Sequence, residues 1–199
     1  MNTLNRWAVL ATLMAGLAGC ASTRAPVLLT LPPAVSGMPV QKAPAAGVRV
    51  LSMTRLDVPE YLVARRVRYR ADDSTLAEWP DTYWAERIEI GVSREFTAAL
   101  RERLRDWRLC ETNCAEQSPA FTLQVRMNRM DYVRSERRLR ANVHLALWTT
   151  ERSPRLARSE EHVYDIPGDS DTAQSQARAL TELLRAVAAD VAQAVAAAS

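Results

Sequence analysis

Cysteine chemistry is the first possibility that the sequence raises, because the chain of 199 residues contains Cys20, Cys110 and Cys114. Cys110 and Cys114 have three residues between them, whereas thiol redox motifs usually have two. This spacing favours a structural disulfide over a redox pair, with two free thiols as the remaining alternative. On a continuous helix, Cβ atoms four residues apart lie about 5–6 Å from each other, and a disulfide needs about 3.8 Å. We therefore expect a disulfide only if the preceding helix ends before Cys110.

Cys20 has a different setting, because it follows Leu17-Ala18-Gly19 at the end of the uncharged segment 7–19. Arg6 precedes this segment, so residues 1–19 have the charge and hydropathy pattern of an export signal. The segment is too short to span a hydrocarbon core of about 30 Å, which requires about 20 apolar residues in a helix. Leu-Ala-Gly-Cys resembles a bacterial lipobox, in which the signal peptide is removed before the cysteine. The thiol then receives a diacylglycerol and the new amine is acylated, for example with palmitate.

Two features bear on where such a lipoprotein would reside. Ala21 follows the cysteine, in place of the aspartate that retains some lipoproteins at the inner membrane. This difference favours the inner leaflet of the outer membrane, with the protein facing the periplasm. The alternative is an ordinary secretory signal that has a cysteine at the junction by chance.

His144, His162 and Ser170 are the other side chains that could take part in catalysis or metal binding. Both histidines lie in strand-like patterns without a second histidine or cysteine at ligand spacing, so we expect no metal site. Gly168-Asp169-Ser170 is similar to the nucleophile block of some esterases, but these enzymes need a later histidine and none follows Ser170. We interpret this stretch as a helix cap and expect no enzymatic activity and no cofactor.

The charge balance gives no indication of a nucleic-acid partner. Without Arg6 of the signal segment, 25 basic residues stand against 23 acidic ones, which gives a net charge of +2. Proteins that neutralise many phosphates usually have a clear basic surplus. We therefore expect no nucleic acid among the partners of this protein.

The rest of the chain divides into two parts by composition. Residues 20–46 are rich in Pro, Ala and Val and lack a sustained periodicity, which predicts a lipidated tether. Within this segment, residues 27–31 have the composition of a short edge strand. Residues 47–199 have the length of a single domain.

Alternation of apolar and polar residues predicts strands over residues 48–58, 66–70, 75–79, 121–133, 139–148 and 156–166. Apolar residues at spacings of three and four between Trp84 and Trp107 predict a helix that begins at Asp81 or Thr82. A second apolar stripe over 173–195 predicts a C-terminal helix. This order predicts an α+β fold, with one mainly antiparallel β-sheet and two long amphipathic helices packed on one face.

Several short motifs follow one another in a characteristic order. The lipobox is followed by Val27-Leu28-Leu29-Thr30-Leu31-Pro32-Pro33, by Pro59-Glu60-Tyr61-Leu62, by Arg66-Val67-Arg68-Tyr69 and by Tyr83-Trp84-Ala85-Glu86. Paired strands and an alanine-rich final helix complete the order. In these motifs the chain resembles the ABC-type transport auxiliary lipoprotein family over almost its whole length after Cys20.

The resemblance implies an outer-membrane lipoprotein, anchored by its N-terminal lipid, that assists an ABC-type lipid transporter. It also implies a homo-oligomer, such as a ring, and a partner protein with an MCE domain. A structural or regulatory lipoprotein that activates a cell-wall synthase is the alternative function. Trp79, Tyr83 and Trp84 mark either the partner interface or a buried corner of the domain, because large aromatic side chains are frequent at both.

Overall fold

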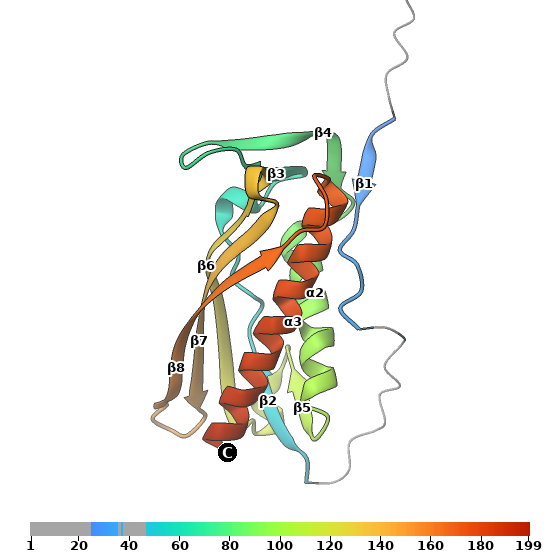
Figure 1. The fold of residues 1–199 in the computed structure, drawn as a ribbon. Coiled ribbons are helices and arrows are strands. Elements are labelled where there is room, and N and C mark those ends of the chain that lie inside the picture. Colours follow the sequence, from blue (N-terminus) through green and yellow to red (C-terminus); the bar gives the residue numbers. More distant parts are fainter. Residues whose placement is uncertain (1–24, 36, 38–46) are drawn as a thin grey trace, which may run out of the picture.

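The computed structural model describes residues 25–35, 37 and 47–199, and Figure 1 shows the arrangement of their helices and strands. Cys20 and the segment 1–19 lie outside the described residues. The strands are β1 (Val27–Leu29), β2 (Arg49–Met53), β3 (Arg66–Arg70), β4 (Leu76–Trp84), β5 (Trp107–Cys110), β6 (Phe121–Val133), β7 (Arg138–Thr149) and β8 (Leu156–Pro167). The helices are α2 (Ile88–Arg103) and α3 (Ala173–Ala198), with 3-10 turns at η1 (Glu60–Leu62), η2 (Cys114–Gln117) and η3 (Arg134–Glu136).

The strands form one mixed sheet of eight, so the prediction of a mainly antiparallel sheet is wrong. Among the described strands, the parallel pairs are β1 with β4, β2 with β5, β2 with β6 and β3 with β6. The antiparallel pairs are β3 with β4, β6 with β7 and β7 with β8. Alternation indicates where a strand lies but not its direction. The parallel pairing of β2 with β6 is possible because β3, β4, α2 and β5 lie between them and return the chain to the same end of the sheet.

β6 is a long strand that pairs with three other strands of the sheet. Along one edge it pairs with β7 over its whole length, so the hairpin predicted from residues 121–133 and 139–148 is present. Along its other edge it pairs with β2 near its start, where Leu51 is opposite Phe121. At its end it pairs with β3, where Arg70 is opposite Val133. The N-terminal strands thus share a single edge of β6.

Helix α2 begins at Ile88, so the predicted start at Asp81 or Thr82 is wrong. Residues 80–84 instead continue β4, in which Trp84 is opposite Leu29 of β1. Asp81 has a φ of 47°, outside the right-handed helical region. Trp84 was included in the apolar stripe of the predicted helix. An apolar residue is equally compatible with burial in a sheet, so its residue type did not distinguish the two. The helix also ends early, at Arg103, and Trp107 begins β5.

The two helices pack against each other, and α3 also lies on β7 and β8 (Figure 1). Phe96 of α2 and Leu183 and Val187 of α3 are completely buried between these layers. Thr172 caps the start of α3 by accepting a hydrogen bond from the backbone N–H of Ser175. No helix in the described part of the chain is both long enough and apolar enough to cross a membrane.

Candidate functional site: the N-terminal strap and the β1 surface

Residues 27–35, which we call the strap, are packed onto the domain although they belong to the segment expected to be a tether. β1 adds a parallel strand beside the end of β4. Leu29, Leu31 and Ala34 are buried, with exposed fractions of 8%, 4% and 4%. A Cβ atom on Gly91 of α2 would lie 3.6 Å from Leu31 and 3.2 Å from Glu86, so the glycine leaves room for both. The strap is therefore part of the hydrophobic core.

Beyond β1, the backbone of the strap is bound by both helices. Glu95 of α2 accepts a hydrogen bond of 2.8 Å from the Ala34 N–H. Arg185 of α3 donates to the carbonyl oxygens of Ala34, at 2.6 Å, and of Pro33, at 3.1 Å. Because proline has no N–H, only its carbonyl remains to be satisfied. The strap thus joins α2 to α3.

The three aromatic residues that the sequence marks as interface candidates all lie in β4. Trp79 is buried, its Nε1 donates to Gln176 of α3 at 2.7 Å, and its ring lies 5.0 Å from that of Tyr69. Trp84 is buried as well. Only Tyr83 is partly exposed. The two tryptophans therefore occupy a buried corner of this chain, and Tyr83 remains a candidate for contact with a partner.

Tyr83 lies in a row with side chains of the two neighbouring strands. Leu28 of β1 and Arg66 of β3 are both opposite Tyr83 in register, and opposite residues project to the same face of a sheet. The guanidinium groups of Arg66 and Arg65 lie 5.0 Å and 6.0 Å from the centre of the Tyr83 ring. Leu28 is 59% exposed. We call the surface formed by Leu28, Val63, Arg65, Arg66 and Tyr83 the β1 surface.

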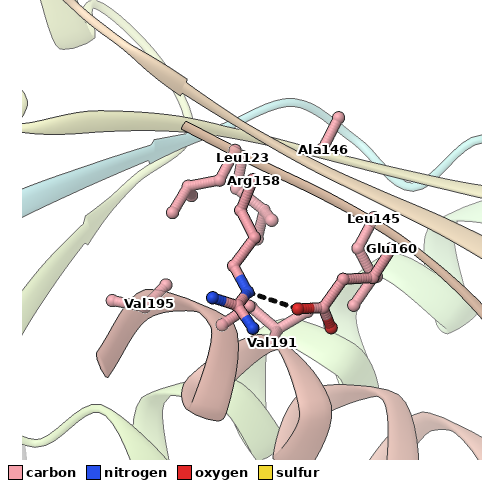
Figure 2. Close-up of a pocket in the computed structure, with 9 residues that line it drawn as sticks. Leu123, Leu145, Ala146, Arg158, Glu160, Val191 and Val195 are labelled. Carbon is pink, nitrogen blue, oxygen red and sulfur yellow. Dashed lines mark hydrogen bonds and ion pairs between the residues drawn. The ribbon is translucent and has the colours of Figure 1, made fainter. Parts of the chain in front are cut away.

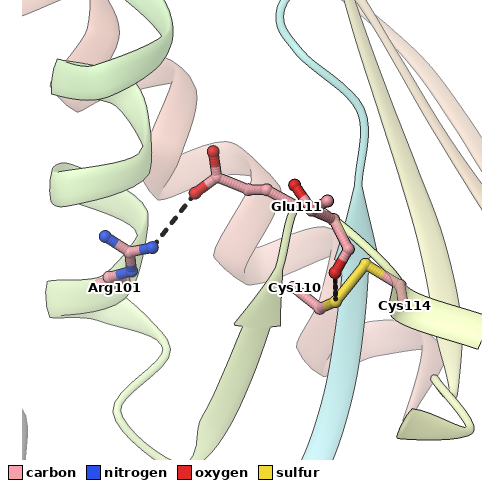
Figure 3. Close-up of a disulfide and its surroundings, with 5 residues drawn as sticks. Arg101, Cys110, Glu111 and Cys114 are labelled. Atoms are coloured by element: carbon pink, nitrogen blue, oxygen red, sulfur yellow. Dashed lines mark hydrogen bonds and ion pairs between the residues drawn. A yellow bond between two sulfur atoms is a disulfide. The ribbon is translucent and has the colours of Figure 1, made fainter. Parts of the chain in front are cut away.

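The structure contains a disulfide between Cys110 and Cys114, with a Cα–Cα distance of 5.6 Å (Figure 3). It closes the turn that leads from β5 to η2, after the chain has left α2. Glu111 inside the turn accepts a hydrogen bond of 3.1 Å from Arg101 of α2. The disulfide therefore has a structural setting, in which it and an ion pair hold the turn beside the helix.

A narrow space lies between β8 and α3, and it is too small for a ligand. Its volume is about 10 Å³, which is at the lower limit for one water molecule. Figure 2 shows Arg158 and Glu160 of β8 paired above Val191 and Val195 of α3. The long side chains cover apolar residues of the helix with their methylene groups. This space does not hold a lipid acyl chain in the structure as it stands.

Polar contacts continue along the same seam, and the sequence analysis did not predict them. Glu160 contacts His162 at 3.0 Å, and the Tyr164 hydroxyl donates to Asp190 of α3 at 2.6 Å. Burial of Tyr164 and its bond to Asp190 raise the pKa of that hydroxyl above its usual range. In the sequence, positions 158, 160, 162 and 164 alternate on one face of the predicted strand. Alternation does not show which face α3 covers, so it did not indicate these contacts.

The residues considered for catalysis are engaged in structural contacts. The Ser170 hydroxyl contacts Asp169 at 3.1 Å and Thr172 at 3.0 Å, directly before α3. Hydrogen bonds from Arg178 and neighbouring groups hold the pKa of the Asp169 carboxyl well below its usual range. His144 contacts Ser159 across the β7–β8 pair at 3.0 Å. Within residues 25–35, 37 and 47–199, no group of three His, Cys, Asp or Glu side chains could hold a metal ion.

Comparison with known proteins identifies relatives by both sequence and fold. The family model of the ABC-type transport auxiliary lipoprotein component matches residues 29–192. The crystal structure of an uncharacterized protein has a TM-score of 0.69 at 15% identity, covering 86% of this chain and 99% of that protein. Protein XCC0632 from Xanthomonas campestris has a TM-score of 0.62 at 14% identity, covering 83% and 92%. At such identities the likeness concerns the fold alone. No curated protein matches the chain by sequence.

Proposed function

Because this chain belongs to the family of ABC-type transport auxiliary lipoproteins, we propose that it assists an ABC/MCE-type lipid transporter from the outer membrane. In this proposal, Cys20 carries the lipid anchor in the inner leaflet, and the domain faces the periplasm. The domain acts by binding an MCE-domain protein of the transporter, as part of a homo-oligomer, and not by catalysis.

The observation that carries this proposal is the family match over residues 29–192, directly downstream of the lipobox that ends at Cys20. The match begins within the strap, at residue 29, nine positions after Cys20. One further observation supports a binding role. The hydroxyl of Ser170, the residue considered as a nucleophile, is engaged in hydrogen bonds at the start of α3.

Metabolic labelling with palmitate tests the anchor. We expect label on the wild-type protein and none on Cys20→Ser, because the thiol is the site of diacylglycerol attachment. The double variant Cys110→Ser/Cys114→Ser is the matched control, since it removes the other two cysteines and should keep the label. An unlabelled wild-type protein would contradict the anchoring proposal.

Affinity capture after crosslinking in native cells tests the partner. We expect an MCE-domain protein and a transporter permease among the captured proteins. Cys20→Ser should capture neither, because that variant is not delivered to the outer membrane. Capture of peptidoglycan enzymes without any MCE-domain protein would contradict the transport role and favour activation of a cell-wall synthase.

A further inference from the structure

We infer that the β1 surface rests against the phospholipid headgroups of the membrane in which the protein is anchored. The inference depends on the proposed lipidation of Cys20 and goes beyond it, because it assigns the face of the domain that meets the bilayer. Docking of the strap onto the domain is the starting observation.

The docked strap leaves only a short connection between the lipid and the folded domain. Val27, the first residue of β1, is seven positions after Cys20. An extended chain spans at most about 3.6 Å per residue, so β1 begins within about 25 Å of the anchored cysteine. A free tether over residues 20–46 would have allowed several times this distance.

This distance is small in comparison with the length of the domain. Helix α3 has 26 residues, which corresponds to about 39 Å at 1.5 Å per residue. In Figure 1, β1 lies at the end of the molecule that contains β3 and β4, and the C-terminus lies at the opposite end. The end with β1 must therefore be the end near the membrane.

The side chains at that end fit the interfacial region of a bilayer. Leu28 is 59% exposed and Val63 43%, so two aliphatic side chains face solvent at one end of the domain. Exposed apolar groups of this kind gain free energy on transfer into the headgroup boundary. Tyr83 is opposite Leu28 in register, and tyrosine is enriched at membrane–water interfaces.

The arginines of the β1 surface supply the complementary charge. The Arg65 guanidinium lies 6.0 Å from the centre of the Tyr83 ring, and Arg65 forms no ion pair among the residues that the structure describes. Arg66 lies 3.4 Å from Glu78, and its side chain is still 46% exposed. A basic residue near an anionic leaflet is attracted by the negative surface potential of the lipids. A phospholipid surface therefore matches both the apolar and the charged parts of this face.

Lipid-borne quenching of a fluorescent label tests this contact. The full lipidated protein is inserted in vesicles of phosphatidylethanolamine and phosphatidylglycerol that contain a nitroxide headgroup lipid. An environment-sensitive fluorophore is attached at Val63→Cys, and the matched control carries it at Ser153→Cys. Ser153 lies in the loop between β7 and β8. The 12 residues of β7 separate this loop from the opposite end of the strand, where β7 begins. The native cysteines do not react, because they are lipidated or joined in the disulfide.

We expect the Val63 label to lose most of its emission and the Ser153 label to keep it. Introducing Leu28→Asp should restore emission from the Val63 label, whereas Val163→Asp, at an 80% exposed position of β8, should not.

Equal emission from both labels on vesicle-bound protein would overturn the inference and leave the anchor intact. A Val63 label that is blue-shifted but not quenched would also overturn it, because a second copy of the chain would then cover this surface. Intact mass decides the anchor separately, and an unmodified Cys20 would overturn both proposals.

Discussion

Asp131 is the clearest case of a single residue on which the stability of this domain depends. Its side chain is completely buried in β6 and accepts a hydrogen bond of 2.8 Å from Arg70 and another from Arg129. Burial alone would raise the pKa of this carboxyl, but the bonds from the two arginines outweigh it and lower the pKa. A carboxylate whose folded-state pKa is depressed stabilises the fold above the unfolded-state pKa of about 3.9.

We expect Asp131→Asn to lower the free energy of unfolding by about 3 kcal/mol at neutral pH, because it leaves two arginines without their buried anion. As the pH falls below the unfolded-state pKa towards the lower folded-state value, the wild type loses this contribution and the two curves converge. Urea unfolding across pH measures both effects. Asp165→Asn is the matched control, since its pair with Arg138 is exposed and should contribute less than about 1 kcal/mol. A constant difference at all pH values would contradict this account of Asp131.

Among the structural elements, the turn between β5 and η2 depends on its disulfide. Cys110 ends β5, and the loop closed with Cys114 spans only five residues, from 110 to 114. The parallel pairing of β5 with β2 leaves β5 at an edge of the sheet. Restricting this short loop in the unfolded chain stabilises the folded state through entropy, although only modestly for so small a loop.

We expect Cys110→Ala/Cys114→Ala to lower the free energy of unfolding by about 2 kcal/mol, the chain-entropy value for a loop of this size. Chemical denaturation of the wild type with and without reductant should give a similar difference. The double variant should not respond to reductant, which serves as the internal control. A reduced wild type that is as stable as the oxidised protein would contradict a structural role for this disulfide.

At the scale of the whole molecule, the folded domain includes the strap, and buried residues of the strap contribute to its core. Leu31 is 4% exposed and packs in the core, whereas Leu28, three positions earlier, is 59% exposed. We expect Leu31→Ala to lower the free energy of unfolding by about 3 kcal/mol, as for other buried leucines. Leu28→Ala, the same change in the same strap, should cost less than about 0.5 kcal/mol. Equal small effects in thermal or urea unfolding would show that the strap adds nothing to the core.

The sequence predicted the strands and the helix in which apolar residues recur at a regular spacing. Alternation predicted β6, β7 and β8, and the apolar stripe from residue 173 predicted α3. The direction of β2 could not be predicted, because it depends on which distant strand is its neighbour. The start of α2 was misplaced because Trp84 is buried by strands and not by a helix.

The candidate site was predicted less well than the fold. The apolar residues of the strap do not recur at a helical or strand spacing. Glu95 of α2 and Arg185 of α3 bind its backbone, and backbone hydrogen bonds do not require particular side chains in the strap. Of the aromatic candidates, Tyr83 alone kept an exposed surface, since burial of the two tryptophans depends on contacts with distant elements such as Gln176.

Docking of the strap also has a consequence for the order of folding. Ala34 is bound by Arg185, 151 positions later in the chain, so most of the domain is synthesised between the two residues. Contacts of such large sequence separation form slowly, because a long loop must close before they stabilise anything. Until α3 is complete, the carbonyl oxygens of Pro33 and Ala34 lack their hydrogen bonds from Arg185, and the strap has only the bonds to β4 and α2. The strap therefore reaches its final docked state only after the C-terminal helix has formed.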